Sequence, residues 1–312
     1  MNERVLITGG AGYLGSVMTP ALLQAGFRVT VLDSLLFSQT TLLDCCNSQM
    51  FEFVKGDICD WQTCKPLLDQ HDIIMPLAAI VGAPACSRNP TLTKLVNYDA
   101  HMRIVEHTSS SQRVVFPTTN SGYGIGEKNA FCTEESPLKP LSEYGQMKVE
   151  VEKAFLDKGN AVTFRLATVF GMSPRMRMDL LVNDFVYKAL KEKVLVLFEE
   201  HFRRNFIHVR DVANAFLFAI NLFGNMRGEA FNVGLSSANL TKRQLAEKIK
   251  EYLPETYIHS AAIGEDPDKR DYLVSNEKIE KLGWRAEYSL DDGIPELIKG
   301  YSIIRPNAFA NV

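Results

Sequence analysis

The chain opens with a short apolar run that leads directly into a cluster of glycines. Residues 4–8 (Arg-Val-Leu-Ile-Thr) predict a buried strand, and the spacing Gly10-x-Gly12-x-x-Gly15 follows before a helical pattern. Glycine allows a tight turn and the close approach of backbone to a pyrophosphate group, while the start of a helix favours an anion. This order of strand, turn and helix therefore predicts a fold that binds a dinucleotide.

The next apolar run ends in an acidic residue at a spacing that distinguishes NAD from NADP. Residues 29–32 predict a second strand, and Asp33 lies 18 residues after Gly15. A carboxylate at this place can accept hydrogen bonds from both ribose hydroxyls of NAD, and it repels the 2′-phosphate of NADP. The alternative is that Asp33 only caps a helix. We predict NAD as the cofactor.

Apolar runs alternate with helical patterns through the first half of the chain. Such alternation predicts an α/β fold, a Rossmann-type doubly wound parallel sheet with helices on both faces. The expected strands are 4–8, 28–33, 51–54, 72–77, 112–117 and 161–166, and the expected helices lie near 13–25, 60–69, 91–109 and 143–157.

From about residue 170 this alternation weakens. We expect residues 1–170 to form an NAD-binding domain and residues 171–312 to form mainly a smaller α/β substrate-binding lobe, interleaved with the first. Basic residues gather in connections around 174–177, 203–208 and 268–271. Arginine matches the geometry of phosphate, so a phosphorylated substrate is expected, with surface salt bridges as the alternative for each arginine. The expected helices of this half lie near 179–192, 210–222, 241–252 and 291–303, and the expected strands near 194–198, 230–233 and 256–259.

Tyr144 and Lys148 stand four residues apart in a predicted helix, with Thr119 upstream beside a predicted strand end. Residues i and i+4 share a helix face, so the ammonium group should lie close to the phenol. A nearby positive charge favours the phenolate and lowers the pKa of the tyrosine toward the range of a general base. Taken alone, a tyrosine and a lysine at this spacing usually lie on a solvent-exposed helix face and have no catalytic role. The convergence of this pair with the glycine turn at one sheet edge predicts a catalytic site.

Composition excludes several other classes of protein. The 312 residues carry a net charge of −3, which gives no electrostatic reason to expect nucleic acid or an anionic membrane as a partner. No apolar stretch approaches the ~20 residues needed to span a bilayer. The six cysteines show neither a Cys-x-x-Cys pair nor a metal-ligand spacing, so no metal is expected. We expect a cytoplasmic enzyme with reduced thiols.

Several motifs together resemble the extended short-chain dehydrogenase/reductase family that acts on nucleotide sugars. They are Thr8–Gly15, Gly56-Asp57-Ile58, Leu77-Ala78-Ala79, Asn97, Thr119, Tyr144-x-x-x-Lys148 and Arg204-x-Phe206-Ile207-His208-Val209. The resemblance runs from about residue 3 to about residue 300. Three stretches, 118–128, 173–185 and 265–272, further resemble the NAD-dependent 4-dehydrogenases of GDP-manno-heptose in bacterial capsular polysaccharide biosynthesis.

The resemblance implies a set of site residues. Those for the cofactor are Gly9, Gly12, Tyr13, Leu14, Gly15, Asp33, Asp57, Ile58, Leu77, Ala78, Ala79, Asn97, Tyr144 and Lys148. Those for the substrate are Asn120, Ser121, Arg175, Asn183, Arg204 and Arg270. The catalytic residues would be Thr119, Tyr144 and Lys148, and family members usually form homodimers through helices that correspond here to 91–109 and 143–157.

The same resemblance implies oxidation of a sugar hydroxyl at carbon 4. The 4,6-dehydratases of the family typically carry an Asp-Glu pair after the catalytic threonine, whereas this chain has Asn120 and Ser121. Neither residue can perform that proton transfer, so dehydration is disfavoured. We expect net oxidation of GDP-D-glycero-α-D-manno-heptose to its 4-keto form. A nucleotide-sugar 4-epimerase and a non-catalytic NAD-binding scaffold are the alternatives.

Overall fold

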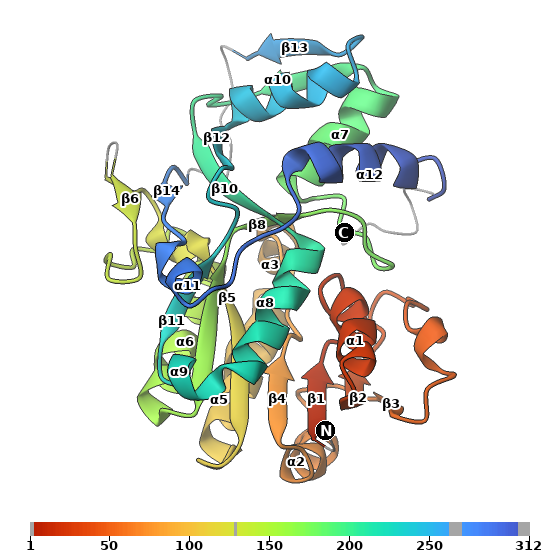
Figure 1. The fold of residues 1–312 in the computed structure, drawn as a ribbon, viewed down its shortest axis with the longest axis vertical. Coiled ribbons are helices and arrows are strands. Elements are labelled where there is room, and N and C mark those ends of the chain that lie inside the picture. The colour runs from red at the N-terminus through yellow and green to blue at the C-terminus, as the bar shows by residue number, and fades with distance from the viewer. Residues whose placement is uncertain (1–2, 128–129, 262–269, 305–312) are drawn as a thin grey trace.

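A seven-stranded parallel sheet forms the centre of the protein (Figure 1). The computed structural model describes residues 3–127, 130–261 and 270–304. The strand order is β11-β7-β5-β4-β1-β2-β3. Its strands are β1 (Arg4–Thr8), β2 (Arg28–Asp33), β3 (Phe51–Lys55), β4 (Ile73–Pro76), β5 (Arg113–Thr119), β7 (Ala161–Leu166) and β11 (Ala230–Val233).

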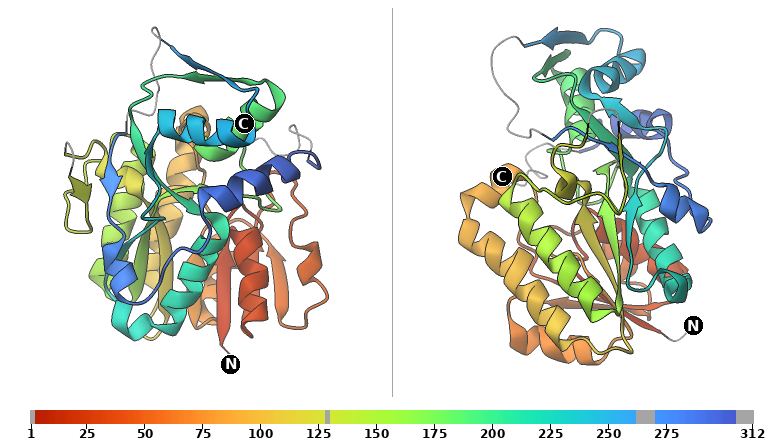
Figure 2. Two further views of the ribbon diagram at one scale, coloured as in Figure 1. Left: turned by 45° about the horizontal axis from the view of Figure 1, so that its top comes forward. Right: turned by 90° about the vertical axis from the view of Figure 1, so that its left-hand side faces the viewer.

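Helices cover both faces of this sheet (Figure 2). On one face, Met18 of α1 (Gly15–Gln24) and Phe216 of α8 (Val209–Asn221) belong to one buried apolar cluster. On the other face, Leu68, Ile104 and Phe155 belong to a second cluster, and they come from three other helices. These helices are α2 (Trp61–Asp69), α5 (Ala100–His107) and α6 (Glu143–Lys158). The predicted doubly wound parallel sheet is therefore confirmed.

The order of the strands fixes where a ligand can bind. The chain runs outward from β1 to β2 and β3, then returns to place β4 on the other side of β1. In parallel sheets the crevice at such a reversal opens at the carboxyl ends of the strands. The glycine turn follows β1 at this point, and the segment after β4 begins at Leu77. Both segments therefore meet at one edge of the sheet.

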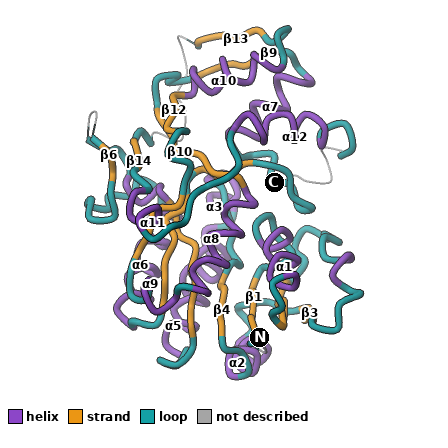
Figure 3. Tube along the Cα trace, viewed as in Figure 1, coloured by secondary structure: helices purple, strands orange, loops and turns teal. Residues whose placement is uncertain are grey.

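Residues after position 170 contribute to both parts of the molecule. Strand β11 and helices α8, α9 (Phe223–Met226) and α11 (Glu277–Lys281) join the central sheet region. Most of the other elements, together with β8 (Thr168–Phe170), form a smaller lobe over the carboxyl edge of the sheet (Figures 1 and 3). Its helices are α7 (Leu181–Lys191), α10 (Lys242–Tyr252) and α12 (Leu290–Gly300), and its strands are β8, β9 (Val194–Leu197), β10 (Arg203–His208), β12 (Asn239–Thr241) and β13 (Tyr257–Ser260).

Three local expectations differ from the structure. Arg203–His208, expected as a connection, forms strand β10, because it pairs with β8 on one side and β12 on the other. Strand β5 extends to Thr119, two residues beyond the expected end. The expected helix 91–109 is divided into α4 (Pro90–Lys94), a π-helical turn at Leu95–Asp99, and α5.

Several further short elements belong to the connections between the main strands and helices. They are α3 (Ala83–Arg88), β6 (Phe131–Cys132), β14 (Leu273–Val274) and the two 3₁₀ turns at Leu43–Cys45 and Asn120–Tyr123. Strands β6 and β14 pair with each other in parallel. Within the described part of the chain, the structure contains no helix that combines the length and apolar character needed for a membrane span.

Candidate active site

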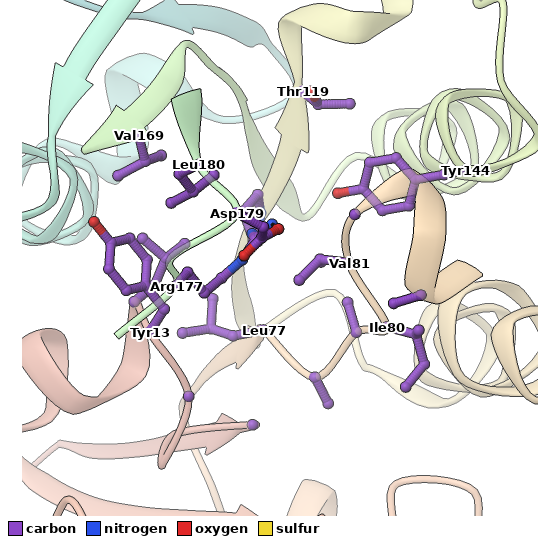
Figure 4. A pocket seen from close by; sticks show the side chains of 18 of the residues that line it. Tyr13, Leu77, Ile80, Val81, Thr119, Tyr144, Val169, Arg177, Asp179 and Leu180 are labelled. Atoms are coloured by element: carbon purple, nitrogen blue, oxygen red, sulfur yellow. Dashed lines mark hydrogen bonds and ion pairs between the residues drawn. The ribbon is translucent and has the colours of Figure 1, made fainter. Parts of the chain in front are cut away.

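A cavity of about 980 Å³ lies at the carboxyl ends of the central strands, and residues of the smaller lobe line its other side. Figure 4 shows the hydroxyl of Tyr144 directed into it, with Arg177 and Asp179 between Tyr144 and Tyr13. The expected site residues that line this cavity are Gly9, Gly12, Tyr13, Leu14, Gly15, Asp33, Asp57, Ile58, Leu77, Ala78, Ala79, Thr119, Ser121, Tyr144, Lys148, Arg175, Arg204 and Arg270.

The glycine turn is packed so closely that side chains would not fit. Gly9 has a φ of +72°, and a Cβ atom there would lie 2.6 Å from the backbone of Ala78. A Cβ atom on Gly15 would lie 2.4 Å from the Cα atom of Gly10. Gly12 lines the cavity directly, where a ligand can approach the backbone. Together with the start of α1, this cradle fits the pyrophosphate of a dinucleotide.

Asp33 lies at the end of β2 and is buried. Its Oδ2 atom accepts from the backbone N–H of Ala11 at 2.9 Å, while Oδ1 accepts from Leu35 N–H at 2.8 Å and from Gln39 Nε2 at 3.3 Å. Burial raises the pKa of this carboxyl above its usual value, and the backbone donors oppose that change. A carboxylate offers about four acceptor sites, so these bonds leave about one for a ribose hydroxyl.

Asn183 lies outside the cavity lining and instead connects the smaller lobe to the glycine turn. Its Oδ1 atom accepts from Gly171 N–H at 3.1 Å, and its Nδ2 atom donates to the Tyr13 hydroxyl at 3.3 Å. The Tyr13 hydroxyl in turn donates to the Gly171 carbonyl oxygen at 2.7 Å. Ser173 Oγ donates to the backbone carbonyl of Tyr13 at 2.8 Å. In this arrangement the Asn183 amide holds protein groups, where a direct contact with substrate was expected.

Asn97 and Asn120 also lie outside the lining. Asn97, on the π-helical turn, accepts from the N–H of Ile80 and donates to its carbonyl oxygen, both at 2.8 Å, which fixes the loop after β4. Asn120 is 1% exposed, and neither atom of its amide has a partner among the described residues. Asn120 was expected to bind the substrate, whereas in the structure the 3₁₀ turn after β5 buries its side chain outside the cavity lining.

Tyr144 and Lys148 occupy the first two turns of α6, whose start is capped by the hydroxyl of Ser142 accepting from Gly145 N–H at 3.2 Å. The Lys148 ammonium donates to the carbonyl oxygen of Pro117 at 3.2 Å and lies 4.5 Å from the centre of the Phe116 ring. Burial lowers the pKa of Lys148 to about 7. The lysine ammonium is therefore directed toward strand β5.

The electrostatics of Tyr144 correct one expectation from the sequence. Burial raises the pKa of Tyr144 to about 12, although Arg177 and Arg270 both act to lower it. Lys148 was expected to dominate this effect. Its ammonium is directed to Pro117, and its own pKa is lowered by burial, so it is a weaker charge than a solvated lysine. The protein groups alone thus favour the neutral phenol.

The smaller lobe supplies a positively charged side to the cavity. Arg175 is 3% exposed, and its guanidinium carbon lies 4.5 Å from the centre of the Phe37 ring. Phe37 belongs to the loop that follows Asp33. Arg175 therefore faces the part of the cavity lined by Asp33. Arg204 is 2% exposed and lies 5.7 Å from the Tyr272 ring. Arg270 donates to the hydroxyl of Ser121, near Thr119.

Sequence reasoning did not single out five charged residues that line this cavity: Arg88, Arg177, Asp179, Asp184 and Lys242. Arg177 forms a two-point ion pair with Asp179, with Nη2–Oδ2 at 2.6 Å and Nε–Oδ1 at 3.2 Å. Lys242, at the start of α10, donates to the carbonyl oxygen of Phe198 at 2.9 Å and also lines the cavity. Arg177 lies two residues after Arg175 in the sequence, but the resemblance singled out Arg175 alone, and no motif distinguished Arg177 from a surface residue.

The geometry agrees with the comparisons with known proteins. The family model described as "NAD dependent epimerase/dehydratase family" matches residues 5–234. The chain belongs to this family. It is an NAD-dependent enzyme of the extended short-chain dehydrogenase/reductase type, and the expected cofactor is confirmed.

Individual relatives span nearly the whole chain. A dTDP-D-glucose 4,6-dehydratase of Homo sapiens is 27% identical over 96% of this chain and 90% of the relative. A putative UDP-glucose 4-epimerase of Methanocaldococcus jannaschii is 27% identical over 94% of this chain and 97% of the relative. Among solved structures, a UDP-glucose 4-epimerase of Thermus thermophilus in complex with NAD has a TM-score of 0.82 and 24% identity, covering 97% and 100% of the two chains.

Proposed function

We propose that the protein uses NAD to oxidise the 4-hydroxyl of a nucleotide-activated sugar to a ketone. One arrangement carries this proposal: Tyr144 and Thr119 line the same cavity, with the glycine turn at one end and several cations of the smaller lobe on its other side. A dinucleotide and a nucleoside diphosphate sugar are the two ligands that such a cavity suits, because cations and helix starts both favour phosphate.

Tyr144, Thr119 and the bound cofactor would each have a separate role in this oxidation. NAD, when bound, supplies the acceptor for the hydride that leaves carbon 4. Tyr144 takes the hydroxyl proton as a phenolate, and Thr119 hydrogen-bonds the same oxygen. Since burial raises the pKa of Tyr144, positive charge must offset that effect. Arg177 and Arg270 supply part of it from the protein.

Loss of water from the sugar is not proposed, because the required acid and base are missing beside Thr119. Asn120 is buried outside the cavity lining, and Ser121 is a hydroxyl engaged with Arg270. Two carboxylates of the smaller lobe also line the cavity, and both are in ion pairs: Asp179 with Arg177, and Asp184 with Lys188 at 2.8 Å.

The sugar nucleotide that we propose is GDP-D-glycero-α-D-manno-heptose. This choice is supported by the resemblance of the stretches 118–128, 173–185 and 265–272 to 4-dehydrogenases of that sugar. Lys128 and residues 265–269 lie outside the described part of the chain. Arg175 and Arg177, in the second stretch, line the cavity.

A 4-epimerase is the second candidate, and the relatives described as UDP-glucose 4-epimerases favour it. It needs the same oxidation at carbon 4, followed by return of the hydride to the other face of the sugar. The proposal and this candidate therefore differ in the released sugar and in whether the cofactor is left as NADH or returned to NAD.

A substrate panel tests both. Purified protein with added NAD is incubated separately with GDP-manno-heptose, UDP-glucose and dTDP-glucose, with Tyr144→Phe as the control. Nicotinamide absorbance and the mass and configuration of the sugar are then measured. We expect NADH to accumulate with a 4-keto product from GDP-manno-heptose. A carbon-4 epimer without accumulated NADH would support the second candidate, and no reaction with any sugar would contradict both.

A further inference from the structure

A chain of hydrogen bonds connects the smaller lobe to the hydroxyl of Thr119. Arg270 Nη1 donates to Ser121 Oγ, and Ser121 Oγ lies 2.8 Å from Thr119 Oγ1. The backbone N–H of Ser121 also donates to Thr119 Oγ1, at 3.1 Å. Three residues from two distant segments thus meet beside the atom that would contact the sugar oxygen.

The backbone that follows Arg270 is held in place by contacts of Asp271 and Tyr272. The carboxylate of Asp271 accepts from the backbone N–H of Arg203 at 2.8 Å and from its Nε at 3.0 Å. The carbonyl oxygen of Asp271 accepts from Gly126 N–H at 2.9 Å. Tyr272 is 2% exposed and packs edge-on against Tyr123. These contacts position the backbone on the C-terminal side of Arg270 relative to β10 and to the 3₁₀ turn that contains Ser121.

The donor properties of arginine determine which atoms donate and which accept in this series of hydrogen bonds. A guanidinium group can only donate, so Ser121 Oγ is the acceptor from Arg270. Accepting from a cation makes the Ser121 O–H a stronger donor and its oxygen a poorer acceptor for a second hydrogen. Of the two directions open to the Ser121–Thr119 contact, donation from the Ser121 O–H to Thr119 Oγ1 is therefore the favoured one. Because a hydroxyl oxygen has two acceptor sites, and Ser121 N–H fills the other, the Thr119 hydrogen is left to point elsewhere.

We propose that Arg270 is a positioning residue that, through Ser121, directs the Thr119 hydroxyl hydrogen into the cavity as a fixed donor to the sugar oxygen. This inference rests on the proposed oxidation. During that reaction the sugar oxygen changes from a hydroxyl, which both donates and accepts, to a ketone oxygen, which only accepts. A fixed donor therefore stabilises the transition state more than the bound substrate, and it acts on kcat.

This role differs from the one that the resemblance implied for Arg270, contact with the diphosphate. A diphosphate ligand would act on substrate affinity, whereas a residue acting through Ser121 would act on turnover. The two roles are separated by measuring binding and turnover independently.

The test is a double-mutant cycle of Arg270→Met, Ser121→Ala and the double variant, with Arg270→Lys as a conservative variant. Arg243→Gln is the matched control, because Arg243 is an exposed arginine of α10 paired with Glu247. Melting temperature and NAD affinity are measured for every variant to confirm folding. Values of kcat and KM are then measured with the sugar nucleotide that wild type oxidises, and calorimetry measures the binding of GDP, UDP and dTDP.

We expect each single variant to lower kcat by about tenfold or more with KM changed less than about twofold, since direct loss of such a donor costs about 10²–10³ in kcat. With kcat taken on the plateau of each pH profile, where the effect of Arg270 on the pKa of Tyr144 no longer enters, the double variant should be no slower than Ser121→Ala, because both residues act through one chain of hydrogen bonds. Arg270→Lys should recover part of the lost kcat, and Arg243→Gln should match wild type.

Two outcomes would overturn the inference. One is a loss of nucleoside diphosphate binding in Arg270→Met of about tenfold or more, which would make Arg270 a diphosphate ligand. The other is a loss of kcat in the double variant that equals the product of the two single losses, as expected for two residues that act independently. An inactive wild type would instead contradict the proposed function, and the calorimetry would still decide for or against a diphosphate role of Arg270.

Discussion

Arg177 is held by Asp179 in a two-point ion pair, at 2.6 Å and 3.2 Å, within the cavity that Tyr144 faces. Its positive charge is the largest effect that lowers the pKa of Tyr144 against the effect of burial. The sequence places that role on Lys148, four residues from the tyrosine. The folded chain assigns part of it to an arginine 33 positions away in the smaller lobe.

Arg177→Gln should therefore raise the pKa of Tyr144 further. Removal of a positive charge disfavours the phenolate, so the rising limb of the pH–rate profile for oxidation should move to higher pH. A shift of about one pH unit would lower the rate near neutral pH by about tenfold. The measurement is kcat/KM with saturating NAD from about pH 6 up to the plateau of the profile, where the tyrosine is fully ionised, beside Arg243→Gln. An inflection point at the same pH as in wild type, with a loss that persists on the plateau, would contradict the electrostatic role.

Lys148 should make the stability of the fold depend on pH. Burial lowers its pKa to about 7, from 10.5 for the free side chain, so the unfolded chain binds more protons between these values. Stability should therefore rise with pH from about 7 to about 10, by up to about 1.4 kcal/mol per pH unit, and this slope should vanish below about pH 7. Urea unfolding of wild type and Lys148→Met at several pH values tests this. Equal slopes for the two proteins would show that Lys148 is not the source.

Gly15→Ala should damage both the fold and NAD binding. The added Cβ atom would lie 2.4 Å from Gly10 Cα, and backbone cannot move aside as a flexible side chain can. We expect a melting temperature lower by several degrees and NAD affinity weaker by about tenfold or more, a loss of about 1.4 kcal/mol in binding. Gly224→Ala is the control, because a Cβ atom there meets nothing within 4 Å. If Gly15→Ala bound NAD as wild type does, the glycine turn would not be the pyrophosphate cradle.

The part of the site that is local in sequence was predictable. The glycine turn, the Asp33 strand end and the Tyr144–Lys148 spacing each depend on a few neighbouring residues, and their convergence follows from the topology of a parallel sheet. All of them line the cavity. The same logic predicted the central strands, since apolar runs between helical patterns have few other arrangements.

The part that depends on contacts between distant segments was not predictable. Arg177, Arg204 and Arg270 look alike in the sequence, as basic residues of expected connections. Only the fold distinguishes a partner of Asp179, a residue of strand β10 and a donor to Ser121. The direction of the Lys148 ammonium likewise depends on Pro117, which lies 31 residues away on another element.

The most direct test of the central claim follows a deuterium atom from carbon 4 of GDP-manno-heptose. Wild type and Tyr144→Phe are each given this substrate and NAD, and both the cofactor and the sugar are analysed by mass spectrometry. We predict deuterated NADH and an unlabelled 4-keto sugar with wild type. Tyr144→Phe should still bind NAD, with transfer slower by about 10²–10⁴-fold. Unlabelled NADH, or transfer at the wild-type rate in Tyr144→Phe, would contradict the account.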